Sequence, residues 1–179
     1  MVAIESGSMG PNIGVGDLVF VMEEGRFASE QAVAGSGVAT ANSSNESGYS
    51  KFHRPGDVIV YQPRGSERAT PVIHRAMFYV EKGEDWTERA DPNHLPDGGV
   101  QCSQLQHCPA PHAGFITLGD NNPGYDQLRS SGARTGPVKP DWVIGTAEFR
   151  MPGLGWLRLN LGIHPSVPVG TADAAVLAS

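Results

Sequence analysis

The chain has 179 residues, 39% of them hydrophobic, and its 19 acidic side chains outnumber the 13 lysines and arginines, which gives a formal net charge of −6. This size and apolar content predict one domain with a real core, with room for a second small lobe. The charge argues against nucleic-acid partners, which need clustered cations, and no window contains the roughly 20 consecutive apolar residues of a membrane-spanning helix.

Two strands are predicted in the first third of the chain. Each follows a Gly-Asp turn, and the mostly apolar runs at 18–22 and 58–61 contain the β-branched residues that favour buried strands. Between them, residues 23–51 are rich in Ala, Gly, Ser and Asn and show no sustained period. We expect this segment to be a flexible surface insertion.

The later strands alternate with segments rich in turn residues. A run of β-branched and aromatic residues at 72–80 predicts a third strand, and shorter strands are expected at 115–118 and 142–147. Prolines and glycines interrupt residues 81–113, which we expect to form a loop or a small subdomain. Residues 164–179 show no core pattern and are predicted to be a poorly anchored tail. Because no segment has convincing helical periodicity, the predicted fold class is mainly β.

A turn near the amino end carries the strongest candidate for a nucleophile. Residues 5–11 read Glu-Ser-Gly-Ser-Met-Gly-Pro. Such a turn can expose the Ser8 hydroxyl while its backbone N–H groups point at a developing oxyanion. A serine hydroxyl is a weak nucleophile until a neighbouring base takes its proton. His74, in Pro71-Val72-Ile73-His74-Arg75, offers that base.

His74 can be explained in two ways. Histidine takes a proton from serine and returns it to a leaving amine near neutral pH, as peptide hydrolysis requires. The simpler explanation is a strand histidine satisfied by a backbone carbonyl. A catalytic His74 needs a carboxylate to orient it, and Asp120 and Asp126 are the candidates. Asp120 can instead bond its own backbone in an Asp-Asn-Asn-Pro turn, so Asp126 is the better candidate.

Four motifs follow one another in a fixed order. They are Glu5-Ser6-Gly7-Ser8-Met9-x-Pro11 with Gly16-Asp17-Leu18-Val19, Gly56-Asp57-Val58-Ile59-Val60-Tyr61, Thr70-Pro71-Val72-Ile73-His74-Arg75, and Gly119-Asp120-Asn121-Asn122. In this order they resemble the sequence boxes of type I signal peptidases, peptidase family S26. Bacterial members carry lysine where this chain has His74, so the chain is similar to the archaeal and endoplasmic-reticulum branch.

The resemblance implies a role for each polar residue of these motifs. Ser8 would be the acylated nucleophile, His74 the general base and Asp126 the residue that orients the imidazole. Asp120 would support the site or share that role. The enzyme would be a serine endopeptidase that needs neither a cofactor nor a metal.

The resemblance also implies how a substrate is held. The Ser6 hydroxyl and the Ser8 backbone N–H would form the oxyanion hole, and Met9 would belong to the same oxyanion and substrate-binding region. Substrates would be secretory preproteins lying extended along a strand edge, with small side chains at the first and third positions before the cut. The implied fold is a peptidase domain over residues 1–163, a coiled antiparallel β-sheet of the signal-peptidase and SOS-repressor type with long loop insertions.

Three departures from the family pattern affect these expectations. Leu118 stands where many relatives have lysine, so an accessory role of that lysine is absent. Gly10 replaces a commoner acidic residue, a change that we expect to be mild. The membrane anchor that usually precedes the Ser-Met motif is missing, which suggests a lost anchor or a partner that holds the domain. By resemblance, we expect location at the cell membrane with the catalytic domain on the extracytoplasmic face.

Two other functions stay open. A self-cleaving Ser-Lys protease of the SOS-repressor type would need Lys51, Lys82 or Lys139 as its base, and none of these lies on a predicted strand in the expected place. A catalytically silent module that binds extended peptides, or an accessory subunit, would have no need to keep the serine, histidine and aspartate together.

The two cysteines define a rival site. Cys102 and Cys108 are separated by five residues, with His107 and His112 close by, which is a weak zinc pattern because the ligand spacing is loose. A small disulfide outside the cytoplasm is the better interpretation. A reduced, inert pair is the remaining alternative.

Overall fold

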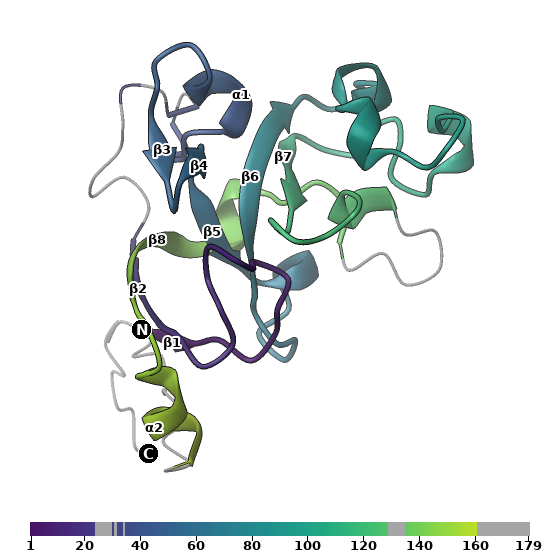
Figure 1. The fold of residues 1–179 in the computed structure, drawn as a ribbon. Helices are drawn as coiled ribbons and strands as arrows, with labels where there is room; N and C mark the ends of the chain where they lie inside the picture. Colours follow the sequence, from purple (N-terminus) through teal and green to yellow (C-terminus); the bar gives the residue numbers. More distant parts are fainter. Residues whose placement is uncertain (24–29, 31, 34, 129–134, 161–179) are drawn as a thin grey trace, which may run out of the picture.

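The computed structural model describes the chain except for residues 24–29, 31, 34, 129–134 and 161–179 (Figure 1). The strands are β1 (Val2–Ala3), β2 (Leu18–Met22), β3 (Ser50–Lys51), β4 (Arg54–Pro55), β5 (Val58–Tyr61), β6 (Val72–Val80), β7 (Gly114–Leu118) and β8 (Val143–Met151). The α-helices are α1 (Ala41–Ser44) and α2 (Gly155–Asn160). The 3₁₀ turns are η1 (Pro63–Gly65), η2 (Trp86–Arg89), η3 (Pro92–His94), η4 (Cys102–Gln104), η5 (Asp126–Leu128) and η6 (Pro140–Trp142).

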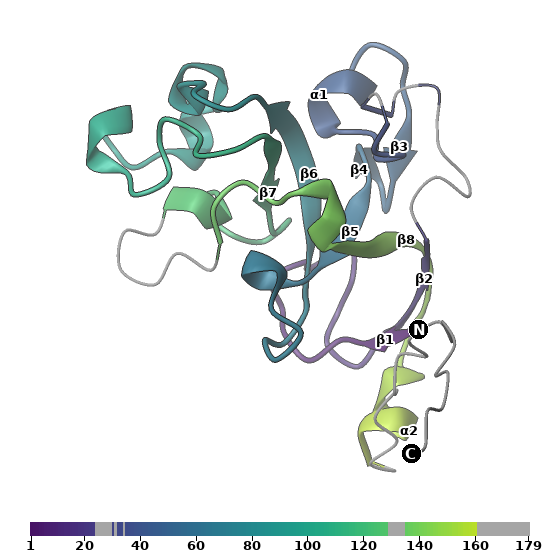
Figure 2. The ribbon, with the colours of Figure 1, turned by 180° about the vertical axis from the view of Figure 1, so that it is seen from behind.

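A curled antiparallel sheet forms the centre of the molecule. Its six strands lie in the order β1-β2-β8-β5-β6-β7, and β3 pairs with β4 in a separate two-stranded sheet. Figure 2 shows from behind how β8 lies between β2 and β5. The predicted mainly β fold with its coiled antiparallel sheet is confirmed.

The predicted strands are those with the longest apolar runs. The runs at 18–22, 58–61 and 72–80 form β2, β5 and β6, and β5 is buried along its whole length. That burial explains its unbroken apolar run, because β5 lies between β8 and β6 with both faces covered. β1 was not predicted, since a strand of two residues cannot show alternation.

The segment from 81 to 113 packs its own apolar cluster against the sheet. It contains η2, η3 and η4, and it ends where β7 begins. Trp86 is fully buried, and its indole N–H donates to the His107 carbonyl at 3.0 Å. The cluster around Trp86 includes Phe78 of β6 and Tyr125. These contacts tie the segment to the strand that carries the candidate base.

Part of the predicted flexible insertion at 23–51 is packed rather than exposed. Val38 and Ala39 are fully buried, and the Asp57 carboxylate accepts the Ala39 N–H at 2.8 Å and the Tyr49 hydroxyl at 2.6 Å. Burial nevertheless raises the pKa of the Asp57 carboxyl. The expectation of a surface insertion is wrong for this part, because a buried carboxylate organises a segment that lacks hydrophobic periodicity. Residues 24–29, 31 and 34 lie outside the described residues.

The two ends of the described chain lie at one end of the sheet. The Gly155 N–H at the start of α2 donates to the Gly16 carbonyl at 2.8 Å, and Figure 1 shows α2 beside β1. The predicted tail at 164–179 lies outside the described residues. Within the described ranges, no helix combines the length and the apolar character needed to cross a bilayer.

Candidate active site

Ser8 lies in a tight turn that follows β1. The Gly10 N–H donates to the Gly7 carbonyl at 3.1 Å, and the Ile13 N–H donates to the Met9 carbonyl at 3.0 Å. The Met9 side chain is fully buried in an apolar cluster under the sheet end. Ser8 itself stays partly exposed. The buried methionine therefore fixes the turn from below and leaves the neighbouring hydroxyl at the surface.

The loop at 119–122 holds this turn from the other side. The Asn121 N–H donates to the Ser8 carbonyl at 2.8 Å, and its side-chain amide donates to the Gly7 carbonyl at 3.2 Å. A Cβ atom on Gly119 would lie 2.7 Å from the Ser8 carbonyl oxygen and 2.6 Å from the Asn122 amide. Glycine is thus required for the close approach of the two backbones.

Ser8, His74 and Asp126 form a continuous hydrogen-bonded series. His74 Nε2 lies 3.1 Å from Ser8 Oγ, and His74 Nδ1 lies 2.6 Å from Asp126 Oδ2. Since an ionised carboxylate can only accept, Nδ1 carries the proton, and the bare Nε2 accepts the Ser8 hydroxyl. The imidazole is therefore oriented to take the serine proton. Both His74 and Asp126 are 4% exposed, so little water reaches the bond between them.

Two hydroxyls support Asp126. Thr117 on β7 donates its hydroxyl to Oδ2 at 2.7 Å, and Tyr61 on β5 donates to the same oxygen at 3.2 Å. With His74, these donors hold the carboxylate of Asp126, which lies on η5, from three strands. Neither Thr117 nor Tyr61 was predicted from the sequence as a site residue. Thr117 lies inside a predicted strand and Tyr61 ends one, and strand periodicity does not tell which side chains meet a carboxylate from elsewhere in the chain.

Asp120 does not contact His74. Its two carboxylate oxygens accept Arg75 Nε at 2.8 Å and Arg75 Nη2 at 2.7 Å, and the Asn12 amide donates to Oδ2 at 2.9 Å. The Arg75 and Asp120 side chains are each 2% exposed. Both oxygens of the Asp120 carboxylate thus bind Arg75 in a buried ion pair. Of the two candidates, the structure brings Asp126 to the imidazole and gives Asp120 a supporting position.

Arg75 is a site residue that the sequence analysis did not assign. It follows His74 on β6 and points to the opposite face of the strand. Besides the pair with Asp120, Arg75 Nη1 donates to backbone carbonyls of the segment 51–56, including Gly56 at 2.7 Å. Its place in the Ile-His-Arg motif was the available signal. A charged residue inside a long apolar strand needs buried partners.

Ser6 and Met9 are placed differently from each other. Ser6 is exposed, and its Oγ lies 3.3 Å from Ser8 Oγ, so its hydroxyl is close to where an oxyanion would form. Met9, which was expected in the substrate-binding region, is fully buried, and its sulfur accepts the Asp120 N–H at 3.4 Å. A substrate cannot reach the Met9 side chain in this structure, because the turn directs it into the core. This corrects the expectation for Met9.

The three lysines lie away from Ser8. Lys51 forms an ion pair with Glu148, and Lys139 stacks over a tryptophan ring at 5.4 Å from its centre. Lys82 is exposed. In the described part of the chain, none of them contributes a hydrogen bond to Ser8. A Ser-Lys mechanism therefore has no base here.

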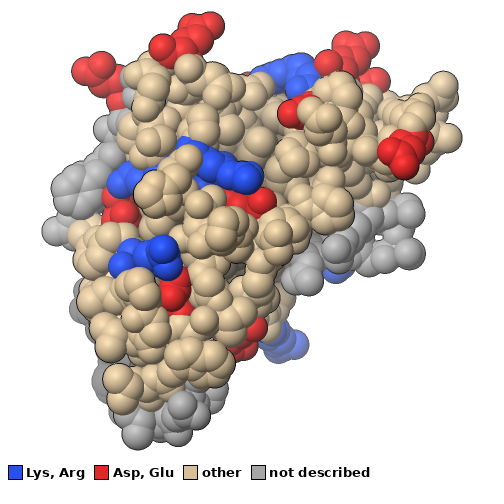
Figure 3. All heavy atoms as spheres, viewed as in Figure 1, with Lys and Arg blue, Asp and Glu red and all other residues tan. Residues whose placement is uncertain are grey.

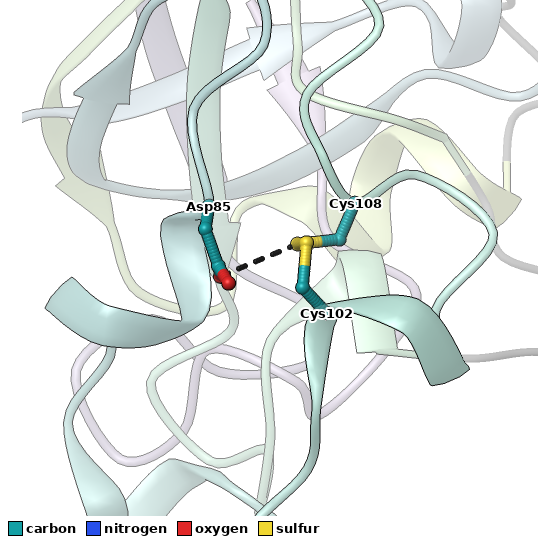
Figure 4. A group of neighbouring side chains, drawn as sticks. All are labelled: Asp85, Cys102 and Cys108. Carbon is teal, nitrogen blue, oxygen red and sulfur yellow. Dashed lines mark hydrogen bonds between the residues drawn. A yellow bond between two sulfur atoms is a disulfide. The ribbon is translucent and has the colours of Figure 1, made fainter.

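Cys102 and Cys108 form a disulfide, the alternative favoured by the sequence (Figure 4). Their sulfurs and an Asp85 carboxylate oxygen lie within 4.8 Å of one another, a grouping that can suggest a metal site. Zinc binds cysteine as the thiolate, and a disulfide offers none. The contact of 3.5 Å between Cys108 Sγ and Asp85 Oδ1 is likewise a polar contact without a thiol hydrogen. His107 and His112 do not join this group among the described residues.

Comparison with known proteins finds relatives of one kind. No family model matches the chain. Over 111 residues the chain is 28% identical to "Signal peptidase complex catalytic subunit SEC11" of Paracoccidioides lutzii. This match covers 62% of this chain and 52% of the relative. It is 29% identical over 112 residues to the sec11 subunit of Talaromyces marneffei, and this match covers 62% of this chain and 51% of that relative. The chain thus spans about half the length of the curated relatives that it matches. The resemblance to signal peptidases is confirmed by relatives that are named as catalytic subunits of a signal peptidase complex.

Proposed function

We propose that this chain is a serine endopeptidase that removes N-terminal signal peptides from secretory preproteins. The observation that carries the proposal is the hydrogen-bonded series from Ser8 Oγ through the His74 imidazole to Asp126, at 3.1 and 2.6 Å. The similarity to subunits named as signal peptidases supports the substrate class. The geometry supports the chemistry independently of that name.

The proposed reaction has two halves. In the first, Ser8 Oγ attacks the carbonyl carbon of the scissile bond while His74 Nε2 takes the serine proton. The C–N bond then breaks, and the imidazolium returns the proton to the leaving amine. In the second half, His74 takes a proton from water, the hydroxide attacks the ester carbon, and Ser8 Oγ leaves with the proton. Asp126 stabilises the imidazolium in both halves.

Two groups would stabilise the oxyanion. The Ser8 backbone N–H and the Ser6 hydroxyl lie next to the nucleophile, and the Ser6 side chain is exposed enough to turn toward a substrate oxygen. Removing one such donor typically lowers kcat by about 10²-fold to 10³-fold. Because the Ser6 hydroxyl has to rotate before it donates, we expect its removal to lower kcat by an amount at the lower end of that range.

The substrate would add to the free side of β1. β1 is the edge strand of the six-stranded sheet, and among the described strands only β2 pairs with it. The chain runs from β1 through the exposed Glu5, Ser6 and Gly7 to Ser8. An extended peptide paired with this edge would deliver its carbonyl to the serine. The residues before the cut would lie along β1, with small side chains at the first and third positions.

We further propose that the peptidase works at a membrane, with the catalytic domain on the extracytoplasmic face. Preproteins reach such an enzyme at the membrane during secretion. The relatives are named as catalytic subunits of a signal peptidase complex, so partner subunits are plausible for this chain also. An anchor or a partner would then hold the domain in place.

Replacement of Ser8 by alanine tests the chemistry. A purified preprotein with its signal peptide is incubated with the wild type, with Ser8→Ala and with Ser66→Ala, an exposed serine outside the site. We expect cleavage at the signal junction by the wild type and Ser66→Ala and none by Ser8→Ala. A serine-directed phosphonate should label the wild type and Ser66→Ala but not Ser8→Ala. Unchanged cleavage by Ser8→Ala would overturn the proposal.

A further inference from the structure

A cleft of about 280 Å³ opens next to the 119–122 loop. Its lining comes from α1 and β4, from the segment that runs from η2 to η3, and from β6. Its polar lining includes Arg54, Arg75, Arg89, His94 and Asp120. Figure 3 shows cationic side chains in the middle of the molecular face and at its upper edge. The cleft is large enough for a short stretch of peptide.

Arg54 is the uncompensated cation of this cleft. Arg75 is neutralised by Asp120, and Arg89 is paired with Glu84 at 2.7 Å. The Arg54 guanidinium donates to the Asp120 backbone carbonyl at 3.3 Å and has no carboxylate partner among the described residues. The side chain is exposed, so its charge can be offered to a ligand without a prior ion pair being broken.

A second group in the cleft also lacks a partner. The Nδ1 atom of His94 is buried and makes no hydrogen bond within the described part of the chain. The ring packs edge-on against Tyr125 at 5.8 Å between centres, which fixes its direction. Asp91, the other carboxylate of the lining, already accepts the backbone and side-chain N–H groups of Asn93 at 2.9 Å. Within the described residues, Arg54 is therefore the group to which an acidic ligand in the cleft would supply acceptors.

The cleft adjoins the loop that supports the nucleophile turn. Asp120 lines it, and the next residue, Asn121, donates its N–H to the Ser8 carbonyl at 2.8 Å. On β6, the lining residue Arg75 follows His74 but points to the opposite face of the strand, so the loop at 119–122 is the link between the cleft and the site. Arg54 donates to the Asp120 carbonyl at 3.3 Å, and the next residue, Asn121, binds the Ser8 carbonyl. Since an extended chain advances about 3.3 Å per residue, we expect a peptide that reacts at Ser8 to come within reach of Arg54 within about two to four residues.

We infer that this cleft receives the residues that follow the scissile bond, and that Arg54 selects an acidic side chain among the second to fourth of them; this rests on the proposed function. With the residues before the cut along β1, those after it leave on the other side of Ser8, toward the cleft. A guanidinium binds a carboxylate through two parallel hydrogen bonds. A lysine at the same substrate position would be repelled by Arg54.

Selectivity between matched substrates is the direct test. Three precursors that differ only in Glu, Gln or Lys at the third position after the cut are compared by kcat/KM, and the set is repeated for the second and fourth positions. At the preferred position, the wild type should favour Glu over Gln by about fivefold. Arg54→Gln should remove that ratio, Arg54→Lys should restore part of it, and the exposed Arg68→Gln should keep it. A wild type without preference at all three positions, or an unchanged ratio in Arg54→Gln, would overturn the inference.

Binding of the released end separates this inference from the proposed function. Fluorescent decapeptides that begin at the mature N-terminus, with Glu or Lys at the preferred position, are titrated into the wild-type protein at low and at high salt. Tighter binding of the Glu peptide, weakened by salt and lost in Arg54→Gln, would support the cleft assignment even if no precursor were cleaved. Equal binding of the two peptides would refute it even if precursors were cleaved.

Discussion

Replacement of Asp126 by asparagine should disable catalysis while leaving the fold intact. Asp126 Oδ2 accepts His74 Nδ1 at 2.6 Å and hydroxyls from Thr117 and Tyr61. An amide oxygen in the same place can still accept these bonds, so the main loss is the negative charge. Unit charges about 4 Å apart at an effective dielectric constant of about 20 attract by about 4 kcal/mol. This attraction favours the imidazolium, so its loss should lower kcat about 10³-fold.

The matched control is Asp120→Asn, in an equally buried carboxylate nearby. Asp120 pairs with Arg75 instead of His74, and removing one partner of a buried pair costs about 3–5 kcal/mol of folding free energy. We therefore expect Asp120→Asn to lose stability but to keep kcat per folded molecule within about tenfold of the wild type.

Two assays on the same preparations separate these outcomes. Urea unfolding gives the free energy of unfolding, and cleavage of a saturating precursor peptide gives kcat for the folded fraction. The role assigned to Asp126 is refuted if Asp126→Asn keeps more than about a tenth of the wild-type kcat while folded. It is equally refuted if Asp120→Asn loses as much kcat as Asp126→Asn.

Three further changes test the positioning of the site and the stability of the fold. Gly119→Ala should lower kcat by about 10²-fold with the fold retained, because the added Cβ would meet the Ser8 carbonyl oxygen. Single-turnover cleavage measures this loss, and full activity of the variant would contradict it. Replacing Cys102 and Cys108 together by serine should cost about 2 kcal/mol in urea unfolding, the entropy of closing a short loop, whereas an unchanged midpoint would contradict it. Burial raises the pKa of Asp57, so the folded protein binds more protons and loses stability as pH rises from about 4 through that raised pKa. Asp57→Asn should remove this slope, and parallel stability curves for wild type and variant would contradict it.

The sheet could be predicted from the sequence because its main strands are continuous apolar runs. β5 and β6 are buried and rich in β-branched residues, and the local pattern is enough to identify them. β1 could not be predicted in this way, since its pairing with β2 depends on contacts made after the chain folds. The same holds for the segment around Ala39, where a buried Asp57 replaces hydrophobic periodicity as the organising group.

The motifs were enough to locate the candidate site, but they could not show which side chain contacts which inside it. Sequence spacing offered Asp120 and Asp126 as alternatives, and only the tertiary structure gives one to Arg75 and the other to His74. The expectation for Met9 was wrong for a different reason. The family resemblance implied contact of Met9 with substrate, but consecutive side chains of a turn can point in opposite directions, and this one points into the core.

The buried Arg75–Asp120 pair explains how two distant parts of the chain hold the serine and the histidine in register. Arg75 is the neighbour of His74 on β6, and Asp120 is the neighbour of Asn121, whose N–H binds the Ser8 carbonyl. The ion pair therefore joins the strand of the base to the loop that supports the nucleophile, one residue away from each. Because both partners are buried, they can separate only at a high energetic cost, so the Ser8–His74 distance is set by the folded state itself. The same arrangement places Arg54 against the Asp120 carbonyl, next to the cleft, so a peptide bound there would contact the loop that positions Ser8.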